Sequence, residues 1–266
     1  MANKQWMALV SLMISLPALA GGAAAGPAPD RYARRCQARA ASRYIDPQGT
    51  MLWGTWSGWT EKDRVRAQDQ KSVLVSASLD GLVQGPQGAK ALQLDGGALS
   101  ANGKGAAGAV LRGQSSDGQP VEVAICDAEP TAADPRMVWY RLEAWNPTAQ
   151  EWENPCVPTG AVPNPRAVVM AGVWDEHGAH HVVADKVTFS CENGVISKCA
   201  SWGYRPWANA GGHSLADAHQ ACTRMARADY CGNGQSHTRQ GTMIEYYDAL
   251  GFSPRATTAT KEWDPG

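Results

Sequence analysis

Short apolar runs, separated by glycine-rich and polar turns, fill the middle of the chain from Thr50 onward. Val121–Cys126 alternates between apolar and polar positions, as a half-buried strand does. Met137–Trp145 places bulky side chains on both faces of an extended chain, which predicts a central strand. Two more strands are expected at Val168–Trp174 and Val182–Cys191.

One later segment changes to helical spacing. Leu215, Ala218, Cys222 and Met225 recur three or four residues apart, which predicts a helix from Leu215 to Asp229 with one buried stripe. Ser214 is a suitable N-cap. The pattern as a whole predicts a β-rich α+β fold, an antiparallel sheet or sandwich-like unit with one C-terminal helix tied down by disulfides.

The first residues have the layout of a secretory signal peptide. Lys4 is followed by an uncharged run from Met7 to Leu16 and by small residues before two possible cleavage sites, after Ala20 or after Ala25. The run is too short for a membrane span, which needs about 20 apolar residues. We therefore expect a secreted or periplasmic protein with no transmembrane span in the mature chain.

The expected organisation has three parts: a signal peptide at 1–20, a flexible leader and basic segment at 21–49, and a single β-rich domain at 50–266. Arg31, Arg35 and Arg39 are spaced by four and would align on one helix face, either solvated or attracted to an anionic envelope lipid or polymer. The formal charge of −1 becomes −2 when Lys4 is removed, so we expect no nucleic-acid partner.

The chain has seven cysteines, an odd number. In an oxidising compartment thiols normally pair, so three disulfides and one unpaired cysteine are expected. Cys36, near the leader, is one candidate for the unpaired residue.

The segment Lys198–Asp248 carries several short motifs together: Lys198-Cys199, WGYRPW at 202–207, HQAC at 219–222, and Ala228-Asp229-Tyr230-Cys231. This combination resembles the bacterial ADYC domain family, with the motif region at 186–248. The resemblance implies an exported protein and brings no established activity, ligand or catalytic residue. Family members continue beyond the stretch matching 262–266 to a further cysteine, so the resemblance also implies that the seventh cysteine lacks its partner here.

Geometry narrows the disulfide pairing. If Asn193-Gly194 forms a two-residue hairpin turn, Cys191 and Cys199 do not meet. The helix keeps Cys222 away from Cys231, because each helical residue adds about 1.5 Å. One of Cys191 and Cys199 is then expected to bond Cys222 and the other Cys231. The remaining pair would be Cys126 with Cys156.

Metal and catalytic sites are weighed against simpler structural roles. His219 and Cys222 could share a zinc ion with His213, Cys199 and Cys231, but the gaps between the cysteines are too long for a usual zinc site. The turn containing His177, His180 and His181 is a second metal candidate. We expect no metal and no cofactor at either place.

A hydrolase would need a nucleophile, a base and a residue that orients the base. Asp229, His219 and His237 are the candidates, although the chain has no Gly-x-Ser-x-Gly turn. Trp53, Trp56 and Trp59 could stack on sugars or peptides, but core packing is the simpler interpretation. The sequence thus favours a non-enzymatic module that binds or supports an envelope polymer or protein, with a secreted hydrolase near Asp229, His219 and His237 as the alternative.

Overall fold

A computed structural model describes residues 30–37, 76–114, 120–147, 150–156, 162–175, 178–192, 194–233, 237–239, 241–253 and 261–262. The chain divides into two compact units, Met1–Asp30 and Arg31–Gly266. All features below belong to the second unit. The expected signal peptide and the tryptophans Trp53, Trp56 and Trp59 lie outside the described residues.

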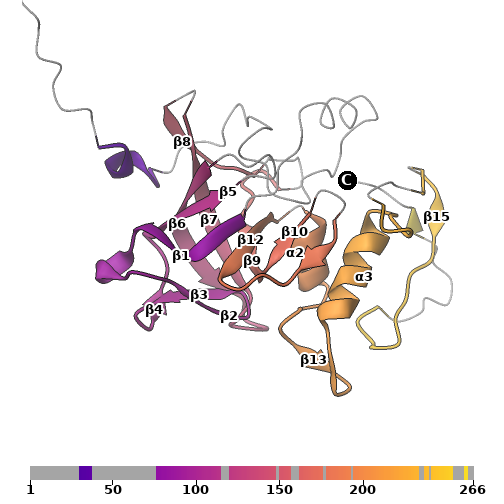
Figure 1. Cartoon of the computed structure of the whole chain (residues 1–266). Helices are drawn as coiled ribbons and strands as arrows, with labels where there is room; N and C mark the ends of the chain where they lie inside the picture. Colours follow the sequence, from indigo (N-terminus) through magenta and orange to yellow (C-terminus); the bar gives the residue numbers. More distant parts are fainter. Residues whose placement is uncertain are drawn as a thin grey trace, which may run out of the picture. The chain divides into compact units, whose positions relative to one another are not determined.

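Six antiparallel strands form a closed ring (Figure 1). In ring order they are β6 (Pro120–Pro130), β5 (Val110–Gln114), β1 (Ser76–Gln84), β12 (Lys186–Cys191), β9 (Ala167–Ala171) and β7 (Val138–Asn146). The ring closes because β7 pairs with β9 on one edge and with β6 on the other. The expected antiparallel, strand-rich fold is confirmed, and its sheet is a barrel instead of a sandwich.

Short elements surround the barrel. They are η1 (Arg31–Arg34), η2 (Pro86–Gly88), β2 (Gln93–Asp95), β3 (Ala98–Ala101), β4 (Lys104–Gly105), β8 (Glu151–Glu153), β10 (Val173–Trp174), β11 (His180–His181), β13 (Asn209–Ala210), β14 (His213–Ser214), β15 (Met243–Ile244) and β16 (Lys261–Glu262). Two helices complete the described part of the chain, α2 (Val195–Ser201) and α3 (Ala216–Ala226).

Strand β7 carries large side chains on both faces because each face packs in a core. Val138, Tyr140 and Leu142 belong to the core inside the barrel, because alternate residues of a strand share one face. On the other face, Trp139 packs in a second core under α2, and Trp145 packs beside the N-terminal segment. The Tyr140 hydroxyl accepts a hydrogen bond from Leu99 N–H at 2.7 Å and so fixes the β2–β3 hairpin to the barrel.

The second core joins the helices to the outside of the barrel. Val168 and Met170 of β9 pack with Val195 and Ile196 of α2, and all four are buried. The expected hairpin turn at 193–194 is therefore wrong, because the chain enters a helix after Gly194. The apolar side of that helix gains more burial on the barrel than a solvated second strand would offer.

The N-terminal end of the second unit packs in a third core, which contains Ala124 of β6 and Trp152 of β8. Arg31 pairs with Glu122 at 2.8 Å, and Trp152 Nε1–H donates to the Arg31 carbonyl at 2.8 Å. Cys36 is bonded to Cys126. Arg31 is thus held in an ion pair with β6, in a 3-10 turn of four residues. Arg39, the last residue of the predicted basic stripe, lies outside the described residues.

Candidate functional site

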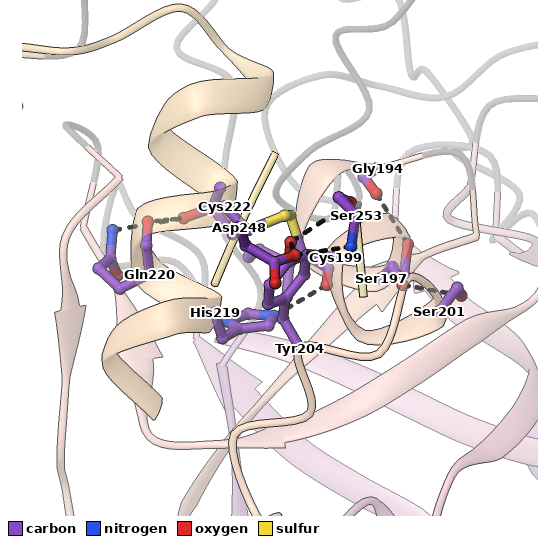
Figure 2. Close-up of a disulfide and its surroundings, with 12 residues drawn as sticks. Gly194, Ser197, Cys199, Ser201, Tyr204, His219, Gln220, Cys222, Asp248 and Ser253 are labelled. Carbon is purple, nitrogen blue, oxygen red and sulfur yellow. Dashed lines mark hydrogen bonds between the residues drawn. A yellow bond between two sulfur atoms is a disulfide. The ribbon is translucent and has the colours of Figure 1, made fainter. Parts of the chain in front are cut away.

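The two helices are joined by a buried disulfide (Figure 2). Cys199 of α2 and Cys222 of α3 have Cα atoms 5.9 Å apart, and both side chains are buried. Tyr204 and Met225 pack around the bridge. The expectation that a disulfide ties the C-terminal helix is confirmed, with α2 in place of the predicted strand as the other anchor.

His219 lies on the buried side of α3, although the predicted buried stripe did not include it. Its exposed fraction is 1%, and its Nε2–H donates to the Ile196 carbonyl at 3.0 Å. Burial lowers the pKa of His219 to about 4, so the imidazole is neutral at neutral pH. It is a structural contact between α3 and α2.

The next residue, Gln220, connects α3 to the β10–β11 hairpin. Its side-chain oxygen accepts from His180 N–H at 3.0 Å, and its amide nitrogen donates to the Gly178 carbonyl at 2.9 Å. Thus His219 and Cys222 of the HQAC motif fix α3 to α2, and Gln220 fixes it to the β10–β11 hairpin.

The first half of the ADYC tetrapeptide forms the end of α3. Ala228 N–H donates to the Met225 carbonyl at 2.9 Å, and Asp229 N–H donates to the Arg224 carbonyl at 2.9 Å. This pair of hydrogen bonds is the Schellman arrangement, in which one residue adopts the left-handed conformation. That residue is Ala228, with φ of 52° and no exposed surface.

Asp229 is a buried carboxylate that organises the following loop. One oxygen accepts from Asn233 N–H at 3.0 Å, and the other pairs with the Arg224 guanidinium. Neighbouring Arg227 is half-buried, and desolvation lowers its pKa to about 10, while Asp229 opposes the shift. Asp229 therefore acts as a counter-charge for the arginines at this helix end.

The second half of the tetrapeptide faces solvent. Tyr230 is 57% exposed, and its hydroxyl lies 3.1 Å from Thr238 Oγ1. Cys231 is exposed and is the unpaired cysteine among the described residues. The tetrapeptide thus combines two structural residues with two surface residues.

The WGYRPW motif also divides between structure and surface. Arg205 and Trp207 both reach Asp134, a buried carboxylate after β6, at 3.5 and 3.2 Å. The Tyr204 hydroxyl donates to the Asp248 carboxylate, which also accepts from Ser253 N–H at 2.7 Å. These contacts hold the segment 241–253 against the motif.

Large apolar side chains remain exposed where these two segments meet. Trp202 is 43% exposed and stacks on Tyr246 with ring centroids 6.4 Å apart. The Phe252 ring packs against Tyr204 and closely approaches Gly203. We call the exposed large side chains of these two segments, together with the half-buried Tyr246, the aromatic surface and define it by five residues: Trp202, Tyr246, Tyr247, Leu250 and Phe252.

Sequence reasoning did not find the aromatic surface. Its signal was the apolar density of MIEYYDALGF at 243–252, which has neither strand nor helix periodicity. Such a segment cannot bury all its large side chains on one face.

The three catalytic candidates do not form one site. His237 lies beside the end of α3, because its N–H donates to the Ala228 carbonyl at 2.8 Å, and its side chain is exposed. His219 and Asp229 lie toward opposite ends of the helix, which places them about 10 Å or more apart along its axis. The three residues of the alternative hydrolase hypothesis are therefore not all within the hydrogen-bond reach that a shared acid–base site requires.

The disulfide pairing differs from the expectation at two places. Cys126 bonds Cys36, and Cys156 bonds Cys191, so the expected Cys126–Cys156 pair is wrong. Cys231 is exposed and unpaired, and its expected bond to Cys191 or Cys199 is also wrong. Cys36, a candidate for the unpaired cysteine, is in fact the partner of Cys126, so that expectation is wrong as well. The error at Cys231 follows from the predicted hairpin, which misplaced the chain after Cys191.

The metal candidates have other partners. Cys199 and Cys222 are in a disulfide and cannot act as thiolate ligands. His181 Nε2 lies 2.7 Å from Asp175 Oδ2, and His180 Nε2–H donates to the Ala171 carbonyl at 2.9 Å. His177 lies outside the described residues. Within the described ranges one other group has metal-like spacing, but its two cysteines, Cys36 and Cys126, are bonded to each other.

No helix in the described part of the chain has the length and apolar character needed to cross a membrane.

Comparisons with known proteins give one result. Neither the curated proteins nor the solved structures include a match. The model of the ADYC domain matches residues 103–265, from the β3–β4 turn to the C-terminal segment. Because the match spans more than half of the chain and includes both helices, the tetrapeptide and the aromatic surface, the chain belongs to the ADYC domain family.

Proposed function

We propose that this chain is an exported, non-enzymatic module that binds a protein of the bacterial cell envelope through its aromatic surface. The observation that carries the proposal is the exposure of four large apolar side chains in the WGYRPW motif and in the 241–253 segment that packs against it: Trp202, Tyr247, Leu250 and Phe252.

The composition of this surface supports a protein partner. Soluble proteins rarely expose large apolar side chains together unless they bind something there. Trp, Tyr and Phe are enriched at protein interfaces, where they supply large contact areas at low entropic cost. In the described residues, four of the eight exposed large apolar side chains belong to the aromatic surface.

The rigid support beneath the surface also favours binding. Tyr204, Asp248 and Ser253 form a hydrogen-bonded group directly behind Phe252, and the Cys199–Cys222 bridge lies next to Tyr204. Side chains held in this way lose little freedom when a partner docks. The three disulfides are compatible with an extracytoplasmic location, where thiols pair.

The test is co-sedimentation of the purified chain with an isolated bacterial envelope fraction. Tyr247→Ala combined with Leu250→Ala should weaken binding by at least about tenfold, because central aromatic contacts dominate interface energies. Val182→Ala is the matched control, because Val182 is 91% exposed but lies on the turn between β11 and β12. It should bind as the unmodified chain does.

The class of partner is read from the same experiment. Protease treatment of the envelope fraction should abolish binding, whereas binding that survives protease and is lost on digestion of the glycan would overturn the assignment to a protein. Equal binding by the double variant and the unmodified chain would reject the aromatic surface as the site.

A further inference from the structure

Three rings from three elements meet where α3 packs on the β10–β11 hairpin. His180 of β11 stacks on Trp174 of β10, with ring centroids 4.2 Å apart. His219 of α3 approaches the same indole ring edge-on, with centroids 6.0 Å apart. Trp174 is 3% exposed and His219 is 1% exposed. Two histidines therefore contact one buried indole.

The surroundings of His219 favour the neutral form of its imidazole. Its hydrogen-bond partner is the Ile196 carbonyl, and the described residues provide no carboxylate in ion-pair contact with it. The titratable group that acts on it electrostatically is His180, which disfavours a positive charge. A proton added to His219 would thus be buried without a counter-charge, which is costly.

The other charged groups of the packed elements already have different roles. Asp175, which follows β10, pairs with His181. Lys198 is the one ionisable side chain of α2 besides its bonded cysteine. Tyr204, which packs against the Cys199–Cys222 bridge, binds Asp248.

We propose that His219 is an acid-sensitive latch, whose protonation releases α3 from the β10–β11 hairpin while the Cys199–Cys222 disulfide keeps α3 attached to α2. We use the word latch for His219, His180 and Trp174. Gln220 would re-form its hydrogen bonds to His180 and Gly178 when α3 closes on the hairpin again. Release would be local, because the core inside the barrel contains neither histidine nor carboxylate.

The direction of the pH effect follows from the two states of His219. Burial lowers its pKa from 6.5 to about 4 in the closed state, and opening restores the ordinary value. The open state therefore binds more protons between those values. Closure is fully favoured above pH 6.5 and weakens as the pH falls toward 4.

The experiment is hydrogen exchange with mass spectrometry, without reductant, on the unmodified chain and on His219→Gln. Gln keeps a donor for the Ile196 carbonyl but does not titrate. Between pH 7 and 4.5, protection of α3 amides relative to their intrinsic exchange rates should fall on the order of 100-fold in the unmodified chain. Peptides from β6 and β7 should stay protected.

In His219→Gln the same change of pH should lower α3 protection by less than about threefold, because the titrating group is gone. His213→Gln, an exposed histidine on β14, is the control and should behave as the unmodified chain. Equal pH dependence in His219→Gln and the unmodified chain, or simultaneous loss of protection in α3 and the barrel, would overturn the proposal.

A second measurement does not depend on the variant folding. The titration of the His219 ring, followed by NMR in the unmodified chain, should show protonation well below pH 6 and coincide with α3 opening. Protonation of His219 at its ordinary pH without opening would also overturn the latch.

Discussion

The four residues of the tetrapeptide have separate physical roles. Ala228 takes the left-handed conformation that ends α3, and Asp229 neutralises the arginines beside it. Tyr230 and Cys231 extend into solvent. Substitutions in the first pair should therefore change stability, and those in the second pair should change the surface.

Ala228 provides a test at this scale. A left-handed conformation costs a non-glycine residue roughly 1–2 kcal/mol, while glycine costs about 0.4–1 kcal/mol in unfolded-chain entropy. Ala228→Gly should therefore leave the free energy of unfolding unchanged or raise it by up to about 1 kcal/mol. Ala228→Val should lower it by about 2 kcal/mol or more, because a branched side chain is strained in this conformation and has no free space in the buried site.

Urea denaturation of both variants measures these changes. If Ala228→Gly were the more destabilising of the two, the assigned helix end would be wrong.

At the scale of elements, α3 is held by many small contacts and one covalent bond. His219 reaches α2, Gln220 reaches the β10–β11 hairpin, and Cys222 bonds Cys199. The helix has 11 residues, too few to be stable by itself in water. Its position therefore depends on the neighbours that it contacts.

Removal of the bridge tests that dependence. The double variant Cys199→Ser, Cys222→Ser should lower the free energy of unfolding by about 3 kcal/mol, as expected for a loop closed over a sequence separation of 23 residues. The measurement is urea denaturation at neutral pH. Cys231→Ser is the matched control and should unfold at the same urea concentration as the unmodified chain, since Cys231 is unpaired and exposed.

At the scale of the whole molecule, two of the cores in the described residues join the barrel to other segments. One joins the barrel to α2, and the other joins it to the N-terminal segment through Cys36–Cys126. The family match begins at residue 103, so barrel strand β1 precedes it. The folded unit is thus larger than the matched region, because β1 completes the ring between β5 and β12.

The three disulfides should differ in their resistance to reduction. Cys36 and Cys126 are both half-buried, whereas the four cysteines of the other two bridges are buried. A dithiol reductant must reach a sulfur atom, so Cys36–Cys126 should be reduced first at neutral pH without denaturant. Alkylation at timed intervals followed by mass spectrometry gives the order. Earlier loss of Cys156–Cys191 or Cys199–Cys222 would contradict the assigned burial.

The sequence by itself determined the strands around Val121–Cys126 and Met137–Trp145, the helix near Leu215 and the family, because local periodicity and short motifs carry that information. Tertiary structure decided whether Gly194 begins a strand or a helix, since the choice depends on the apolar face that β9 and β12 present. It also decided ring closure, the cysteine partners and the aromatic surface. These depend on distances between residues far apart in the chain, which local pattern does not contain.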